Sequence, residues 1–234
     1  MSPQHKEHLK HCWPLALKNS QLLNNSDIKV YLTPNPTEVN ESIQLLKDTF
    51  PKQQLSYHIN VNKGYHEGAI GAMSEGIKHG WFDDYDWIFR VNPDVIIQND
   101  TWMLDVITND NDASFIYIEC QPHLTPRIGN NVRLVHTDFF ALKMSNPLIK
   151  ECLLQQKEGG AEIAFSQQMA PIIEKGEHRH VPDSYPVIQG MCRVNGNPYG
   201  SVYHFQDDFN WVVHIAGDNC PAHFPNLVKE DEQY

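Results

Sequence analysis

Strand-like and helix-like segments alternate between residues 27 and 175 of the chain. The strand-like segments are short runs of β-branched and aromatic residues, whereas the helix-like segments carry apolar residues at helical spacing. This alternation favours an α/β fold whose mostly parallel central sheet is flanked by helices. Strands are expected at residues 27–33, 55–59, 87–91, 113–120 and 133–143, and helices at residues 37–48, 65–79, 147–156 and 161–175.

The chain has no internal repeat, low-complexity tract or long linker, so we expect a single domain spanning residues 1–234. With 18 Lys and Arg against 29 Asp and Glu, its formal net charge is −11. This charge repels a phosphate backbone, and nucleic acid is therefore not an expected partner. No apolar run approaches the roughly 18 residues of a membrane helix, and the N-terminus lacks the apolar core of a signal peptide, so no membrane segment is expected.

The five cysteines are scattered, odd in number and without a C-x-x-C pair. This pattern argues against a zinc site or a redox motif. We expect buried thiols that act as small hydrophobic side chains. The cysteines are Cys12, Cys120, Cys152, Cys192 and Cys220.

The expected helix that precedes the strand at residues 87–91 is rich in glycine. Gly68, Gly71 and Gly76 each cost a helix about 1 kcal/mol relative to alanine, so a compensating contact is expected. Gly64, Gly68, Ala72 and Gly76 recur at every fourth position and form one face of small side chains. Such a face permits close approach either to another backbone or to a ligand, and the spacing does not choose between them.

The start of the same helix offers groups for a phosphate. Asn62, Lys63 and Gly64 precede the helical pattern, and a helix N-terminus with free N–H groups attracts anions. These three residues, together with Gly68, are candidate contacts for a phosphate-bearing cofactor.

Two polar residues end the most apolar strand, in the sequence Asn92-Pro93-Asp94. Residues 87–91 read as a strand buried on both faces, and ligands of α/β sheets bind beyond the carboxyl ends of the strands. Pro93 ends the strand pairing and stiffens the turn that carries Asp94. A carboxylate at this edge can bind a divalent cation, which stabilises a departing diphosphate. The alternative is a plain turn, because Asn, Pro and Asp are common turn residues.

Two other acidic triplets, residues 84–86 and 110–112, compete for this role. The first precedes the strand and the second lies in a polar segment, so both are expected to be solvated turns.

The segment NKGYHEGAIGAMSEGIKHG, followed by DYDWIFRVNPDVII, resembles the donor-binding core of GT-A fold nucleotide-sugar glycosyltransferases. In that family a glycine-opened helix precedes an apolar strand that ends in a DxD motif. Here Asn92 and Asp94 match the two motif positions, which resembles an N-P-D variant of the family. The resemblance implies a GT-A, Rossmann-like fold in which Asn92 and Asp94 hold a divalent metal, Mn²⁺ or Mg²⁺, and in which Arg90 and Asn92 contact the donor.

The resemblance also implies two functional halves, a donor-binding half at about residues 1–110 and an acceptor-binding half at residues 111–234. The family has a first strand that binds the nucleotide base, and residues 4–23 read as the helix after it. We therefore expect the first strand to be missing from an N-terminally incomplete sequence. A lost N-terminal anchor would be compatible with the secretory pathway, including the Golgi.

The acceptor half supplies the other candidates that the resemblance implies. The sequence HTDFFALK, at residues 136–143, resembles the acceptor-side strand of the family. The sequence GGAEIAFSQQMAPII, at residues 159–173, resembles the segment that faces the acceptor hydroxyl. The resemblance therefore implies that Glu162 or Asp138 is the general base. A late histidine often completes the metal shell in this family, and His204 is preferred over His214. The sequence does not choose among the arginines that could contact diphosphate or acceptor, which are Arg90, Arg127, Arg133 and Arg193.

The sequence thus predicts a glycosyltransferase that moves a sugar from a nucleoside diphosphate sugar to a glycan or other hydroxyl acceptor. One alternative is a non-catalytic nucleotide-sugar or carbohydrate-binding domain on the same scaffold, and a second is a metal-dependent hydrolase.

Overall fold

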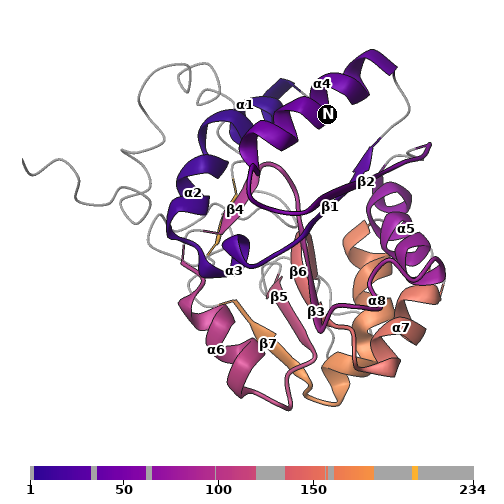
Figure 1. Cartoon of the computed structure of the whole chain (residues 1–234). Coiled ribbons are helices and arrows are strands. Elements are labelled where there is room, and N and C mark those ends of the chain that lie inside the picture. Colours follow the sequence, from indigo (N-terminus) through magenta and orange to yellow (C-terminus); the bar gives the residue numbers. More distant parts are fainter. Residues whose placement is uncertain are drawn as a thin grey trace, which may run out of the picture.

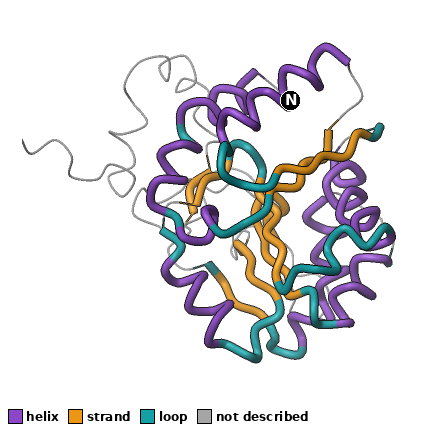
Figure 2. The backbone as a smooth tube through the Cα atoms, in the orientation of Figure 1, coloured by secondary structure: helices purple, strands orange, loops and turns teal. Residues whose placement is uncertain are grey.

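The computed structural model describes residues 3–32, 36–61, 65–97, 99–119, 135–155, 157, 161–181 and 202–204. Its centre is a four-stranded sheet in the order β3-β6-β5-β7, with helices packed around it (Figures 1 and 2). The strands are β3 (Trp87–Val91), β5 (Phe115–Glu119), β6 (Val135–Lys143) and β7 (His178–His180).

The direction of β6 corrects the expectation of a mostly parallel sheet. β6 is antiparallel to β3 and to β5, whereas β5 and β7 are parallel, so the sheet is mixed. Parallel neighbours need a crossover connection, usually a helix. Strands β3 and β5 point the same way, and the connection between them contains helix α6 (Thr101–Asn109). The sequence between β5 and β6 has no helix-like pattern, which fits an antiparallel pair.

Two further strand pairs lie outside this sheet. β1 (Ile28–Leu32) and β2 (Leu55–Ile59) are parallel and are connected by α4 (Pro36–Thr49), as the sequence predicts. β4 (Val95–Ile97) follows the Asn92-Pro93-Asp94 turn and pairs antiparallel with β8 (Val202–His204). The turn therefore connects a strand of the central sheet to a strand of a separate pair.

The two faces of the central sheet bury different side chains of the same strands. In β6, Phe139 and Ala141 join one hydrophobic cluster, and Phe140 and Leu142 join the other. This alternation is the two-residue period of a strand whose faces are both covered. β3 is different, because all five of its residues keep intermediate exposure. The expectation that β3 is buried on both faces is confirmed only in part, because Trp87, Phe89 and Val91 pack against one cluster and Ile88 against the other, but β3 lies at an edge of the described sheet.

Helices α5 (Tyr65–Lys78), α7 (Pro147–Leu154) and α8 (Ala161–Glu174) pack together on one side of the sheet (Figure 1). Within α5, a Cβ atom added at Gly76 would lie 2.2 Å from the Phe82 ring. At this position the small face of the helix therefore serves close packing. At Gly71 a Cβ atom would meet nothing within 4 Å.

The N-terminal segment, expected as one helix, is divided into α1 (Pro3–His11), α2 (Trp13–Asn19) and α3 (Gln21–Asn24). Ser20 ends one helix and caps the next, because its Oγ accepts a hydrogen bond from Leu23 N at 3.0 Å. The buried carboxylate of Asp100 then accepts from Ser20 Oγ at 2.8 Å and from Leu22 N at 2.7 Å. These bonds fix the N-terminal helices to the chain just before α6.

The cysteines depart from expectation at one position. Cys152 is a buried free thiol, as predicted, but Cys12, which is also buried, is disulfide-bonded. Proximity across the fold, which spacing does not reveal, decides such pairing. A search of the described residues for a helix both long and apolar enough to cross a membrane finds none.

Candidate active site at the carboxyl end of β3

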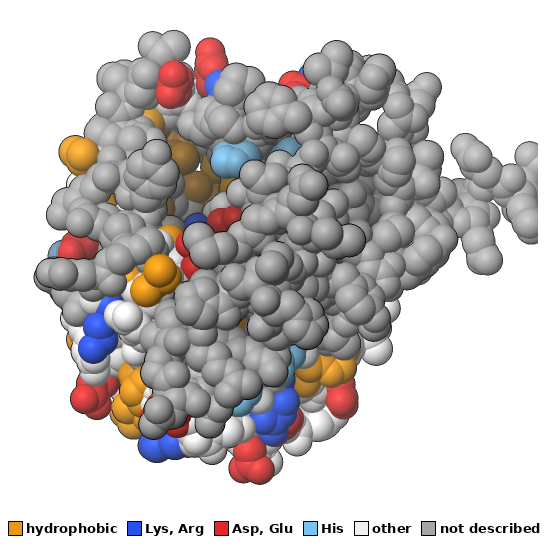
Figure 3. Space-filling view, turned by 180° about the vertical axis from the view of Figure 1, so that it is seen from behind, with side chains coloured by type: hydrophobic (Ala, Val, Ile, Leu, Met, Phe, Trp, Pro, Cys, Tyr) orange, Lys and Arg blue, Asp and Glu red, His pale blue; other side chains and the backbone are white. Residues whose placement is uncertain are grey.

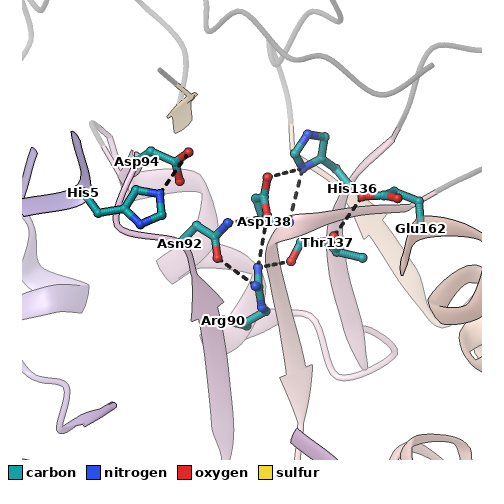
Figure 4. Close-up of polar contacts among 8 residues, drawn as sticks. All are labelled: His5, Arg90, Asn92, Asp94, His136, Thr137, Asp138 and Glu162. Carbon is teal, nitrogen blue, oxygen red and sulfur yellow. Dashed lines mark hydrogen bonds and ion pairs between the residues drawn. The ribbon is translucent and has the colours of Figure 1, made fainter. Parts of the chain in front are cut away.

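The Asn92-Pro93-Asp94 turn lies beside the amino-terminal half of β6. Val91 pairs with Phe139, and Asn92 N donates a hydrogen bond to Asp138 O at 2.9 Å. Because β3 and β6 are antiparallel, the end of one strand meets the beginning of the other. Two candidates from distant parts of the sequence, Asn92 and Asp138, thereby become direct neighbours (Figure 4).

The turn is held from both sides. Val95 N donates to Asn92 O at 3.0 Å and closes the turn, and Trp13 Nε1 in α2 donates to Pro93 O at 3.0 Å. The proline thus does more than end a strand, since its carbonyl is the point at which an N-terminal helix fixes the turn. Asp94 is consequently carried on an anchored piece of backbone.

Arg90 is the central cation of the site. Its guanidinium donates to Asn92 Oδ1 at 2.7 Å and to Thr137 O, and its Nη1 lies 3.6 Å from Asp138 Oδ1. The side chain is only 16% exposed. Burial lowers the pKa of Arg90, while the negative charges of Asp138, Asp94 and Glu162 act in the opposite direction. An arginine stays protonated under these conditions, so one cation faces three carboxylates.

Both ends of the Asn92 amide are engaged. Oδ1 accepts from Arg90 at 2.7 Å, and Nδ2 donates to Asp138 Oδ1. The structure therefore places the Asn92 amide between a guanidinium and a carboxylate, whereas the sequence predicts a metal or donor contact for it. An aspartate at position 92 would set a second carboxylate against Asp138, which explains why an amide stands here.

We expect Asn92→Asp to lower the free energy of unfolding by about 1–2 kcal/mol, because two adjacent carboxylates cannot both stay ionised without cost. Adding Asp138→Asn restores an amide–carboxylate pair in the reverse order and should recover most of the loss. Urea denaturation of the single and double variants measures both effects.

The matched control is Asn109→Asp, since Asn109 Nδ2 donates to Asp105 Oδ1 at 2.7 Å on an exposed helix surface. There the change should stay within about 0.5 kcal/mol. Equal losses at positions 92 and 109, or no recovery in the double variant, would contradict the role given to Asn92.

The two candidate bases lie on neighbouring elements. Glu162 is in the first turn of α8, and its Oε1 accepts from Thr137 Oγ1 at 3.0 Å. Asp138 follows Thr137 in β6, and its N–H donates to Nδ1 of the buried His136 at 3.3 Å. Glu162 and Asp138 are thus held on the two sides of Thr137.

Asp94 lies on the other side of Asn92 and is 16% exposed. Its Oδ2 is 3.7 Å from Nε2 of His5 in α1, a neighbour that the sequence reasoning missed. The pairing of β4 with β8 sets the backbone of His204 opposite Val95, the residue after Asp94. Among the residues that the structure describes, no group of three His, Cys, Asp or Glu side chains is arranged to hold a metal ion.

The remaining candidates divide between the described part of the chain and the rest of it. Gly68 lies in α5 with intermediate exposure. The residues outside the described part of the chain are Asn62, Lys63, Gly64, Arg127, Arg133, Arg193 and His214. Both competing acidic triplets lie in turns or bends, where Asp84, Asp86 and Asp112 are exposed, whereas Asp110 pairs with Arg179.

Figure 3, which shows the back of the molecule, has acidic side chains at the bottom of a recess. Two depressions of the described surface lie around Asp83 and Lys150 and around Asp110 and Arg179, and neither includes Asn92 or Asp94.

Comparison with known proteins gives one similar solved structure, the crystal structure of a glycosyltransferase involved in the glycosylation of the major capsid of PBCV-1. The TM-score is 0.46 and the sequence identity 11%, over 86% of this chain and 98% of that one. No protein-family model matches the sequence, and no curated protein matches it.

Proposed function

We propose that this chain is a glycosyltransferase that moves a sugar from a nucleoside diphosphate sugar to a hydroxyl acceptor. The observation that carries the proposal is a group of carboxylates where β3 ends, in which Asp138 pairs with Arg90, Asp94 lies beyond Asn92, and Glu162 accepts from Thr137. These groups come from a turn, a strand and a helix, and two of them occupy different sides of the Asn92 amide (Figure 4). Separate carboxylates at one sheet edge can serve cation binding and proton transfer independently.

A divalent cation, Mn²⁺ or Mg²⁺, fits the donor set near Asp94. Hard divalent cations are bound by one or two carboxylates together with substrate phosphates, and Asp94 is a partly exposed carboxylate with an imidazole close by. When bound, the cation would supply charge neutralisation for the diphosphate leaving group. Arg90 does not take this role directly, because its guanidinium is already bonded to Asn92 and to Thr137 O.

Glu162 is the proposed general base. Within the described part of the chain its carboxylate accepts one hydrogen bond, from Thr137, whereas Asp138 faces both Asn92 and Arg90. Glu162 accepts the proton of the acceptor hydroxyl while that oxygen bonds to the anomeric carbon. The bond from the anomeric carbon to the diphosphate oxygen breaks, and its electron pair leaves with the diphosphate. Asp138 keeps Arg90 and Asn92 in place.

The engaged Asn92 amide favours a second candidate, a non-catalytic nucleotide-sugar or carbohydrate-binding domain. A domain of this kind binds donor without turnover and without needing a cation at Asp94. The less favoured third candidate, a metal-dependent hydrolase, releases sugar or phosphate without an acceptor.

A thermal-shift screen of nucleotide sugars, each with and without Mn²⁺, separates these functions. For a glycosyltransferase we expect one donor to raise the melting temperature only when Mn²⁺ is present, since a ligand at 100 times its Kd adds about 2.7 kcal/mol of stability. Stabilisation that is unchanged by EDTA, with no turnover, would favour the binding domain. Sugar release that no acceptor accelerates would favour the hydrolase.

A further inference from the structure

His5 and Asp94 face each other without a direct hydrogen bond. Their closest atoms, Nε2 and Oδ2, are 3.7 Å apart, which exceeds hydrogen-bond distance. The two side chains are 31% and 16% exposed.

Independent contacts hold each partner in place. Two contacts join helix α1 to helix α4. Lys6 Nζ of α1 lies 2.9 Å from Glu41 Oε2 of α4, and Thr49 Oγ1 of α4 donates to Leu9 O of α1 at 3.1 Å. The turn that carries Asp94 is held by Trp13 through Pro93 O. The separation of His5 from Asp94 is therefore set by the packing of the N-terminal helices.

The sequence predicts that Asp94 and Asn92 both provide oxygen ligands to the cation. The amide oxygen of Asn92 instead accepts a hydrogen bond from Arg90. We propose that His5 is the second protein ligand of the cation that Asp94 binds, so that an imidazole from α1 replaces the first residue of the N-P-D sequence. This inference rests on the proposed function. Nitrogen and oxygen ligands lie about 2.0–2.2 Å from a metal such as zinc, so two ligands of one ion can be separated by up to about 4 Å.

The ligand types indicate which ions the site prefers. Imidazole suits later transition metals such as Zn²⁺ better than Mg²⁺, which favours oxygen ligands and retained waters. A site of one imidazole and one carboxylate leaves the remaining positions to water and to diphosphate oxygens. His204, whose backbone lies opposite Val95, is the alternative source of an imidazole.

Pulsed EPR of bound Mn²⁺ tests the proposal without an activity assay. The wild-type protein should show coupling of Mn²⁺ to an imidazole nitrogen, and His5→Ala should abolish this coupling and weaken Mn²⁺ binding at least about 10-fold. The matched control is His11→Ala. His11 lies on the same helix, 3.2 Å from Glu7 Oε2, and both side chains of this pair are about one-third exposed.

The outcomes separate this inference from the proposed function. Loss of nitrogen coupling in His5→Ala but not in His11→Ala or His204→Ala supports a His5 ligand. If Asp94→Asn weakens Mn²⁺ binding but His5→Ala does not, or if the wild-type ion shows no nitrogen coupling, the His5 inference is overturned and the function stands. If Mn²⁺ binding is insensitive to Asp94→Asn, the proposed cation site itself is wrong.

Discussion

Replacing Arg90 with methionine is expected to lower the free energy of unfolding by about 2–4 kcal/mol. This range is slightly below that for a fully buried ion pair, because the Arg90 side chain is 16% exposed. Methionine keeps much of the volume but leaves Thr137 O and Asn92 Oδ1 without their donor. It also removes the positive charge that faces Asp94, Asp138 and Glu162. The loss is therefore both of hydrogen bonds and of charge balance.

Urea denaturation at neutral pH measures this loss, and Arg179→Met is its matched control. Arg179 also pairs with a carboxylate, through Nε to Asp110 Oδ2 at 2.6 Å and Nη2 to Asp110 Oδ1 at 2.9 Å. This pair is about one-third exposed, so its removal should cost at most about 1 kcal/mol. If the two variants lose equal stability, Arg90 does not organise the site as described.

Glu162→Gln should reduce sugar transfer by about 10²–10⁴-fold, the usual contribution of a positioned general base. Glutamine is nearly isosteric and can still accept from Thr137 Oγ1, but it cannot take the proton of the acceptor hydroxyl. Donor affinity and melting temperature should therefore change little. Initial rates of transfer, measured with donor binding by calorimetry, separate the two effects.

Glu174→Gln provides a control on the same helix, because Glu174 is exposed at the far end of α8. Its transfer rate should equal that of the wild type. A Glu162→Gln enzyme that keeps more than about a third of the wild-type rate would assign the base elsewhere, with Asp138 as the next residue to change.

Most elements were predictable from the sequence because their patterns are local. The strand at residues 55–59 has the predicted bounds, and the helices α5, α7 and α8 begin where their apolar periodicity begins. The direction of β6 was not predicted. The signal was nevertheless present, since no helical pattern separates residues 113–120 from residues 133–143 and an antiparallel return needs no crossover helix.

The site was predictable in part. Asn92 and Asp94 could be proposed as polar residues at the end of an apolar strand, and Asp138 from the family resemblance. The structure brings Asn92 and Asp138 into contact. The use of the Asn92 amide could not be foreseen, because it depends on Arg90 and on the strand register. His5 could not be found either, because only the packing of α1 brings it next to Asp94.

The most direct test of the account is calorimetric titration of Mn²⁺ and of a stabilising nucleotide sugar into the wild-type protein and into Asp94→Asn. The account predicts that donor binding to the wild type requires Mn²⁺, and that Asp94→Asn loses both Mn²⁺ binding and Mn²⁺-dependent donor binding while its melting temperature is retained. Mn²⁺-dependent donor binding of wild-type strength in Asp94→Asn would contradict it.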